Sequence, residues 1–175
     1  RKSIISFFKN CLSTYDEKYY KKFYNEKDPI VKNYSFSTYF KNQKIEEEKI
    51  IVEDKKFELN VTTSDYETGI ILYNSFNRQK YKQYPLTNNF MTLQNIVMIM
   101  EKEITSESIK IKFQSPLCVR YRENKKDYYY SYENEKFEEI LKINIKEQLK
   151  ITDISEEMVD TLKIKPINAK KVLIK

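Results

Sequence analysis

The chain has one glycine, Gly69, among its 175 residues, and it has no histidine. Phosphate-cradling loops and dinucleotide-binding fingerprints need several glycines, because a Cβ would keep the backbone away from the phosphate. Histidine is the side chain that ordinarily changes its charge near pH 7. The two absences exclude the common nucleotide-binding loops and the usual acid–base group of an enzyme. Any chemistry must therefore depend on tyrosine, lysine, arginine and carboxylate side chains.

Basic and aromatic side chains are in surplus. Lysine and arginine number 32 against 26 acidic residues, and the chain has 15 tyrosines and 10 phenylalanines, many of them beside lysine. Bases of single-stranded RNA stack on aromatic rings while cations contact the phosphates, so this composition favours an RNA partner. The alternative is that abundant Lys, Ile, Asn and Tyr reflect an AT-rich genome.

Several other protein classes are excluded. Cys11 and Cys118 are too few and too far apart for a disulfide framework, and without histidine they complete no Cys/His zinc site. No apolar run approaches the roughly 20 residues that span a bilayer. We expect a cytoplasmic protein that has no membrane partner and needs no metal or other cofactor.

Helical and strand-like spacings alternate along the first hundred residues. Capping boxes at Ser13-Thr14 and at Ser64 predict the starts of two helices. The expected elements are helices over about 4–15 and 15–25, a strand over 34–40, a hairpin of 49–52 with 57–61 after a solvated acidic loop at 46–48, a helix over 64–78 and a strand over 90–100. With one more strand before Arg1, this is the βαββαβ order of a ferredoxin-like, RNA-recognition-type fold.

The second part of the chain begins with a similar pattern. Apolar and polar residues alternate on both sides of Pro116, and a helix with a buried apolar face is expected from Asn134 or Glu135. The strands expected here cover 109–114, 117–122, 162–165 and 171–174. The sequence thus predicts an α+β protein of two domains, 1–104 and 105–175.

Five segments carry a family resemblance. They are Tyr34–Ser37, Asn60–Asp65, Phe113–Arg120, Tyr129-Tyr130 before the last long helix, and Lys165–Val172. In order and spacing they resemble the CRISPR-associated repeat endoribonucleases, which process precursor crRNA.

The resemblance implies two tandem ferredoxin-like domains of the RAMP type, with the second incomplete. A first strand is expected before Arg1 and a glycine-rich end after Lys175. It also implies cleavage of CRISPR repeat RNA without metal, in which a ribose 2′-hydroxyl attacks the neighbouring phosphate and leaves a 2′,3′-cyclic phosphate. The implied partners are the repeat RNA, other subunits of a crRNA-guided complex and a second copy of the chain.

The resemblance also indicates site residues. Tyr24 falls at the position of the family's catalytic histidine, Lys32 at that of its lysine, and Phe8 at that of an early tyrosine. The other interpretation is a half-buried aromatic ring for Tyr24 and a surface lysine for Lys32. From Arg120 onward, the RNA-binding candidates would line a groove between the domains or else belong to a solvated hairpin and sheet edge. The full set of candidates is Lys21, Lys22, Arg120, Arg122, Lys125, Tyr129, Lys165 and Lys170.

Three functions remain open at this point. The first is the endoribonuclease itself. The second is a non-catalytic subunit that holds RNA in a crRNA ribonucleoprotein. The third is a protein–protein adaptor on the same fold, which leaves the basic and aromatic surplus without a role.

Overall fold

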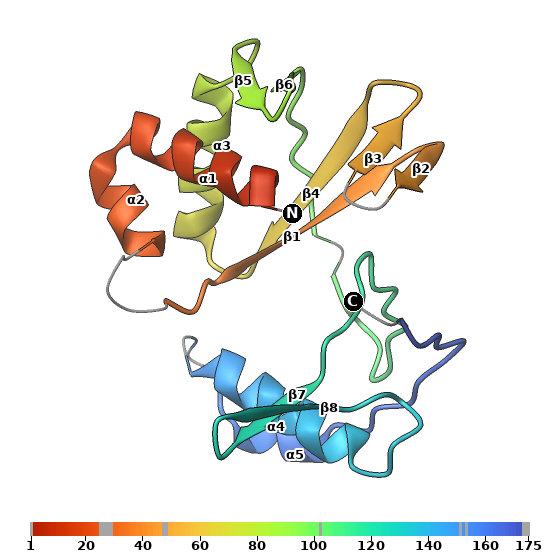
Figure 1. Ribbon diagram of the computed structural model, residues 1–175. Helices are drawn as coiled ribbons and strands as arrows, with labels where there is room; N and C mark the ends of the chain where they lie inside the picture. The colour runs from red at the N-terminus through yellow and green to blue at the C-terminus, as the bar shows by residue number, and fades with distance from the viewer. Residues whose placement is uncertain are drawn as a thin grey trace. The chain divides into compact units, whose positions relative to one another are not determined.

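The chain forms two compact units, Arg1–Ile111 and Lys112–Lys175, in a computed structural model (Figure 1). Both units combine helices with small two-stranded antiparallel sheets, which confirms the predicted α+β class. No helix among the described residues is both long and apolar enough to cross a membrane. The structure describes residues 2–24, 30–46, 49–101, 103–150, 152 and 154–172.

Three helices build the core of the first unit: α1 (Lys2–Tyr15), α2 (Glu17–Phe23) and α3 (Tyr66–Arg78). Apolar side chains recur every three or four residues along α1, so one face of this helix is buried against α3 and α2. Burying one such large apolar side chain contributes about 1.5–3 kcal/mol. The buried core residues are Ile4, Phe7, Phe8, Cys11, Leu12, Phe23, Tyr34, Ile71, Leu72 and Phe76.

Aspartates, not the predicted hydroxyl residues, cap the two later helices. The Asp16 carboxylate accepts a hydrogen bond from the Lys18 backbone N–H at 2.8 Å, and Asp65 caps α3 in the same way. The prediction of Ser13-Thr14 as a cap is wrong because α1 continues through both residues. The Ser64 prediction is wrong by one position, since the carboxylate that follows it reaches the first-turn N–H groups.

The main hairpin pairs β1 (Tyr34–Phe40) with β4 (Phe57–Thr63), in a register that places Tyr34 opposite Thr63. β2 (Gln43–Glu46) and β3 (Lys49–Val52) pair with each other between them. The predicted pairing of 49–52 with 57–61 is therefore wrong. β1 and β4 both have half-buried apolar side chains on the core, whereas β3 is mostly exposed and pairs with the strand that precedes it.

Two segments of the first unit differ from the predicted pattern. Glu46 ends β2 instead of lying in a loop, and the other two glutamates of the acidic run fall outside the described residues. A short hairpin pairs β5 (Gln83–Leu86) with β6 (Asn89–Thr92). Its second strand, β6, overlaps the start of the predicted strand 90–100. Beyond Leu93, which bridges to Lys80, residues 94–100 form no strand.

The second unit is a hairpin packed on a helix. β7 (Arg120–Glu123) pairs with β8 (Lys126–Tyr129), and α4 (Phe137–Leu149) packs on β7 and on α5 (Glu157–Thr161). The Asn144 side chain on α4 accepts a hydrogen bond from the Arg120 N–H at 3.0 Å and donates to the Arg120 carbonyl at 2.8 Å. The predicted helix is confirmed, with Val119, Ile140, Leu141 and Val159 buried.

Several predicted strands of the second half are wrong. Residues 109–114 and 162–165 form no strand, and α5 was not predicted. Of the predicted strand 171–174, residues 171 and 172 form no strand and the rest lies outside the described residues.

Left-handed backbone conformations occur here without glycine. Gly69 lies inside α3, and the described residues with positive φ are Asn42, Lys55, Tyr81, Asn88, Asn124, Lys125 and Asn168. Asparagine tolerates this region better than most side chains, because its short polar group can hydrogen-bond locally. Asparagine therefore occupies most of the left-handed positions described here, which in other proteins are often occupied by glycine.

Candidate functional site

Two tyrosine hydroxyls meet where α2 ends and β1 begins. Tyr24 is the C-cap of α2, and its backbone N–H donates to the Tyr20 carbonyl at 2.8 Å. Tyr34 is the first residue of β1, and its ring stacks on Phe8 with the centroids 5.5 Å apart. The two hydroxyl oxygens lie 2.6 Å apart, so one hydroxyl donates to the other.

Two lysines lie over the ring of Tyr24. The Lys32 ammonium is 4.8 Å from the ring centroid and the Lys9 ammonium is 5.1 Å from it. These are cation–π distances. The structure thus brings together the two predicted catalytic residues, Tyr24 and Lys32, although seven residues separate them in sequence.

Burial determines the protonation of the two hydroxyls. It raises the pKa of Tyr24 above its ordinary value, and the hydrogen bond from Tyr34 offsets only part of that rise. The pKa of Tyr34 is raised further, by burial first and then by the hydrogen bond with Tyr24. Both phenols therefore stay protonated at neutral pH, and the lysines do not turn Tyr24 into a phenolate. Tyr24 can donate a proton there, but it is a poor base.

A polar network fixes the segment that carries Lys32. The next residue, Asn33, donates through its side-chain amide to Asp65 at 2.9 Å and to Thr68 at 2.8 Å. The Asn33 carbonyl accepts from the Thr63 hydroxyl at 2.6 Å. The Thr68 hydroxyl donates to Asp65, and this bond lowers the pKa of that carboxyl. The backbone beside Lys32 is thereby tied to the start of α3 and the end of β4.

The predicted RNA-binding lysines of α2 form exposed ion pairs. Lys21 lies 3.8 Å from Glu17, and Lys22 lies 2.8 Å from Glu67 on α3. Exposed pairs of this kind contribute only about 0–1 kcal/mol, because water and salt screen them. A phosphate can therefore replace either carboxylate at small cost.

Arg120, Arg122 and Tyr129 share one face of the β7–β8 hairpin. Arg120 stands opposite Tyr129, and Arg122 stands opposite Asp127. Directly opposite residues of antiparallel strands lie on the same face, and so do alternate residues of one strand. Val119, which is buried, belongs to the other face. The arginine face therefore points away from the core and combines two cations with a ring that is 67% exposed.

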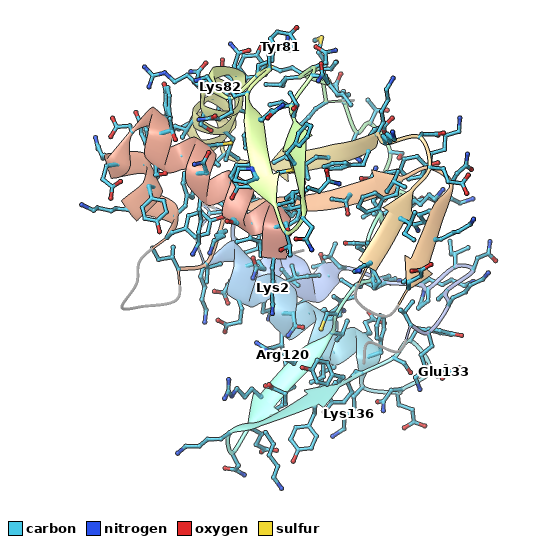
Figure 2. The ribbon with its side chains drawn as sticks, turned by 45° about the horizontal axis from the view of Figure 1, so that its top comes forward. Lys2, Tyr81, Lys82, Arg120, Glu133 and Lys136 are labelled. Atoms are coloured by element: carbon cyan, nitrogen blue, oxygen red, sulfur yellow. The ribbon has the colours of Figure 1, made fainter. Side chains whose placement is uncertain are left out.

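One carboxylate balances this arginine face in part. Asp127 lies 3.8 Å from a guanidinium nitrogen of Arg120 and 3.8 Å from one of Arg122. Figure 2 labels Arg120 on its strand. Lys125 lies in the turn between the strands with φ of 63°. Lys165 and Lys170 are exposed and follow α5 without regular structure.

The sequence did not indicate every member of the tyrosine cluster. Tyr34 and Lys9 were not among the predicted site residues, although each contacts Tyr24. The position of Tyr34 could have indicated its place in the site, because it is the first residue of the strand that follows Lys32. Among the described residues, no group of three or more His, Cys, Asp or Glu side chains is placed to hold a metal ion.

Residues 99–175 match the family model described as CRISPR associated protein Cas6, C-terminal. The match includes three of the segments on which the resemblance was based, Phe113–Arg120, Tyr129-Tyr130 and Lys165–Val172. A search of the curated proteins found no match, and a search of the solved structures found none either. The family consists of endoribonucleases, and the match supports a role of the chain in processing CRISPR RNA. Over residues 99–175, the chain is thus similar to the C-terminal part of the Cas6 proteins, which supports the family of CRISPR-associated repeat endoribonucleases.

Proposed function

We propose that the protein cleaves CRISPR repeat RNA in the cytoplasm by a metal-independent attack of a ribose 2′-hydroxyl. The observation that carries this proposal is the cluster of Tyr24, Tyr34 and Lys32 at the junction of α2 and β1. It combines a protonated phenol with an ammonium group, and two of its members, Tyr24 and Lys32, fall at positions where the resemblance expects catalytic residues.

The architecture that we propose is two tandem ferredoxin-like domains, 1–104 and 105–175. The order α1, β1, β4, α3 in the first unit supports it, because a helix, an antiparallel hairpin and a second helix form the middle of a βαββαβ domain. Side chains of β1 and β4 also pack on the core that α1 and α3 share.

In the proposed reaction the 2′-oxygen bonds to the adjacent phosphorus and the bond from phosphorus to the 5′-oxygen breaks. The 2′-hydroxyl proton goes to solvent hydroxide, and the departing 5′-oxygen takes a proton from Tyr24. Lys32 stabilises the negative charge that grows on the phosphoryl oxygens. The products are a 2′,3′-cyclic phosphate and a free 5′-hydroxyl. Tyr24 then regains its proton from water.

RNA binding is assigned to exposed cations and one ring. Two of the lysines lie on α2, the helix whose C-cap is Tyr24. The arginine face of the β7–β8 hairpin can contact phosphates while Tyr129 stacks on a base. Other subunits of a crRNA-guided complex and a second copy of the chain are further proposed partners. The proposed RNA-binding residues are Lys21, Lys22, Arg120, Arg122, Lys125, Tyr129, Lys165 and Lys170.

The test is incubation of end-labelled repeat RNA with the full-length protein in EDTA. A single cut with a 2′,3′-cyclic phosphate supports the proposal. Tight binding without cleavage would identify a non-catalytic RNA-holding subunit instead. If no salt-sensitive binding occurs, the adaptor function stands in place of both.

Variants test the residue assignments separately. Tyr24→Phe removes the proton donor and keeps the ring, and Lys32→Gln removes the charge; each should slow the single-turnover cleavage rate by about 10²-fold, the size typical of general-acid or electrostatic groups. Lys18→Gln is a matched control, because Lys18 is exposed on the same helix as Lys21 and Lys22. Unchanged rates in both site variants would remove these roles while the family assignment stands.

A further inference from the structure

The turn from α3 into β5 carries an unusual set of side chains. Arg78 is the last residue of α3, and Lys80, Tyr81 and Lys82 follow it before β5 begins. We call these four residues the α3–β5 turn surface. None of them belongs to the site described above. Figure 2 shows Tyr81 and Lys82 together at this turn.

Tyr81 adopts a backbone conformation that does not suit tyrosine. Its φ is 65°, in the left-handed region that bulky residues rarely adopt. Its backbone N–H donates to the Leu93 carbonyl at 2.9 Å, and Lys80 bridges to Leu93, so the conformation is fixed by backbone contacts. Such strain destabilises the folded chain, and strained residues are common at functional sites.

Packing does not explain why a tyrosine occupies this position. Its side chain is 68% exposed, so burial of the ring offsets little of the backbone cost. Of the seven described residues with positive φ, four are asparagines and two are lysines, so Tyr81 is the one aromatic residue among them. An exposed ring held at a strained position is suited to contact with something outside the chain.

All of the charged residues near Tyr81 in the sequence are basic. No acidic residue occurs from Thr68 to Met100. The Lys80 ammonium lies 5.1 Å from the centroid of the Tyr81 ring. None of the ion pairs found in the part of the chain that the structure describes involves Arg78, Lys80 or Lys82. A polyanion can therefore approach without displacing a carboxylate.

Arg78 anchors this surface to the end of α1. Its guanidinium donates to the backbone carbonyls of Thr14 at 3.3 Å and Tyr15 at 3.1 Å, and it lies 5.5 Å over the Tyr15 ring. The Tyr15 ring in turn stacks on Tyr19 at 5.8 Å. The basic and aromatic character of the turn thus continues onto α1 and α2.

We infer that the α3–β5 turn surface is a second binding site for single-stranded RNA, separate from the cleavage cluster. A base stacks on Tyr81, and the phosphates on either side contact Lys80 and Lys82. The inference rests on the proposed function for its choice of RNA as the polyanion. It adds a site at which single-stranded RNA flanking the cleaved position can be held.

The test measures binding of a fluorescein-labelled oligouridylate of about 12 nucleotides, within the usual length of a single-strand site, to the full chain. Tyr81→Asn removes the ring and supplies a residue that tolerates the backbone conformation. Binding should weaken by about tenfold, the loss expected for one stacked base. The matched control is Lys55→Asn, since Lys55 also has positive φ, at 51°, but lies in the turn between β3 and β4; it should bind like the wild type.

A second variant tests the cations. Lys80→Gln combined with Lys82→Gln should lower the slope of log binding constant against log salt by about 1.4, since each phosphate contact to a single strand contributes about 0.7. Tyr81→Asn should leave that slope unchanged. Thermal melts of all variants check that the first unit stays folded.

The outcomes separate this inference from the proposed function. If Tyr81→Asn and the double lysine variant bind oligouridylate as the wild type does, the inference is overturned, whether or not repeat RNA is cleaved. If oligouridylate binding depends on Tyr81 while the wild type fails to cut repeat RNA, the inference stands and the nuclease proposal fails.

Discussion

The hydroxyl oxygens of Tyr24 and Tyr34 lie 2.6 Å apart, and burial raises the pKa of both groups. In the folded chain both keep their protons above pH 10, where an unfolded tyrosine loses its proton. The unfolded state then binds fewer protons, so the free energy of unfolding falls as the pH rises. Below about pH 10 the contribution of the pair is fully present.

The corresponding prediction concerns alkaline denaturation. The urea midpoint of the wild type should decline more steeply between pH 9.5 and 11 than that of a Tyr24→Phe/Tyr34→Phe double variant, which has no hydroxyl to titrate here; these pH limits bracket the ordinary tyrosine value of about 10. Tyr66→Phe, which removes a tyrosine that is 82% exposed, is the control and should keep the wild-type slope. Equal slopes in all three proteins would contradict the burial of the pair.

Cleavage should show a pH profile unlike that of a histidine nuclease. Because the chain supplies no histidine and the raised pKa of Tyr24 makes it a donor, the single-turnover rate should rise steadily from pH 6 to 9 as hydroxide increases. The measurement is a rate series on repeat RNA in EDTA across this range. A plateau that begins near pH 6.5 would indicate a general base with a histidine-like pKa of about that value.

The two cysteines should differ in reactivity. Cys11 is buried in α1, where desolvation raises its pKa to about 12, and Cys118 is exposed. A thiol reagent at pH 8 should modify Cys118 at once and Cys11 only at the rate of unfolding, because the thiolate is the reactive form. Mass spectrometry of peptides after timed quenching resolves the two positions. Rapid labelling of Cys11 would mean that the α1 core opens readily.

Asp65 should support the fold at neutral pH and lose that effect in acid. Its carboxylate accepts hydrogen bonds from Thr68 and Asn33, and the bond from the Thr68 hydroxyl lowers its pKa. The stabilisation is present above about pH 4 and is lost as the pH falls through the lowered folded value.

Two substitutions check this expectation for Asp65. Asp65→Ala should cost about 1 kcal/mol at pH 7, the usual value for an N-cap. Asp65→Asn should flatten the fall of the urea midpoint between pH 5 and 2.5, a range around the ordinary aspartate value of about 3.9. Asp54→Asn is the control, because Asp54 is exposed in the turn after β3. Acid slopes that are the same for Asp65→Asn and the wild type would rule out the titration of this cap.

Gly69→Ala should stabilise the chain. Gly69 lies inside α3, where alanine is favoured by about 1 kcal/mol. An added Cβ would meet the Thr63 methyl at 3.5 Å, which is an ordinary contact, so no close approach to the strand requires glycine. A melting temperature higher by several degrees is the expected result. A lower one would show that β4 cannot tolerate the added methyl group.

The elements that the sequence predicted correctly are those with strong local signals. The helix over α3 and the strand Tyr34–Phe40 follow from apolar spacing and from alternating aromatic residues. Pairing was harder, because β4 prefers the distant strand β1, with which it shares the core, over its neighbour β3. The alternating pattern at 109–114 also predicted a strand that does not form. The apolar side chains of this segment are exposed, and the segment belongs to none of the sheets in the described chain.

The candidate site was accessible from the sequence only in part. Tyr24 and Lys32 were predicted as site residues through the family resemblance, and the structure places the Lys32 ammonium over the Tyr24 ring. The phenol pair was not found, because a hydroxyl contact between residues ten positions apart depends on how α2 ends and β1 begins. The raised pKa of Tyr24 was not predictable either, because it follows from burial of the hydroxyl. The lysines near Tyr24 in the sequence give no sign of that burial.

The left-handed turns without glycine have a consequence for the denatured state. A glycine-poor chain has fewer backbone conformations to lose on folding, so its unfolded ensemble has lower entropy than that of a chain with glycine in each turn. The cost of these turns lies in native-state strain at residues such as Tyr81 and Lys125 instead. Replacing them by glycine would relieve that strain but raise the entropy of the unfolded chain, so the two effects would largely cancel.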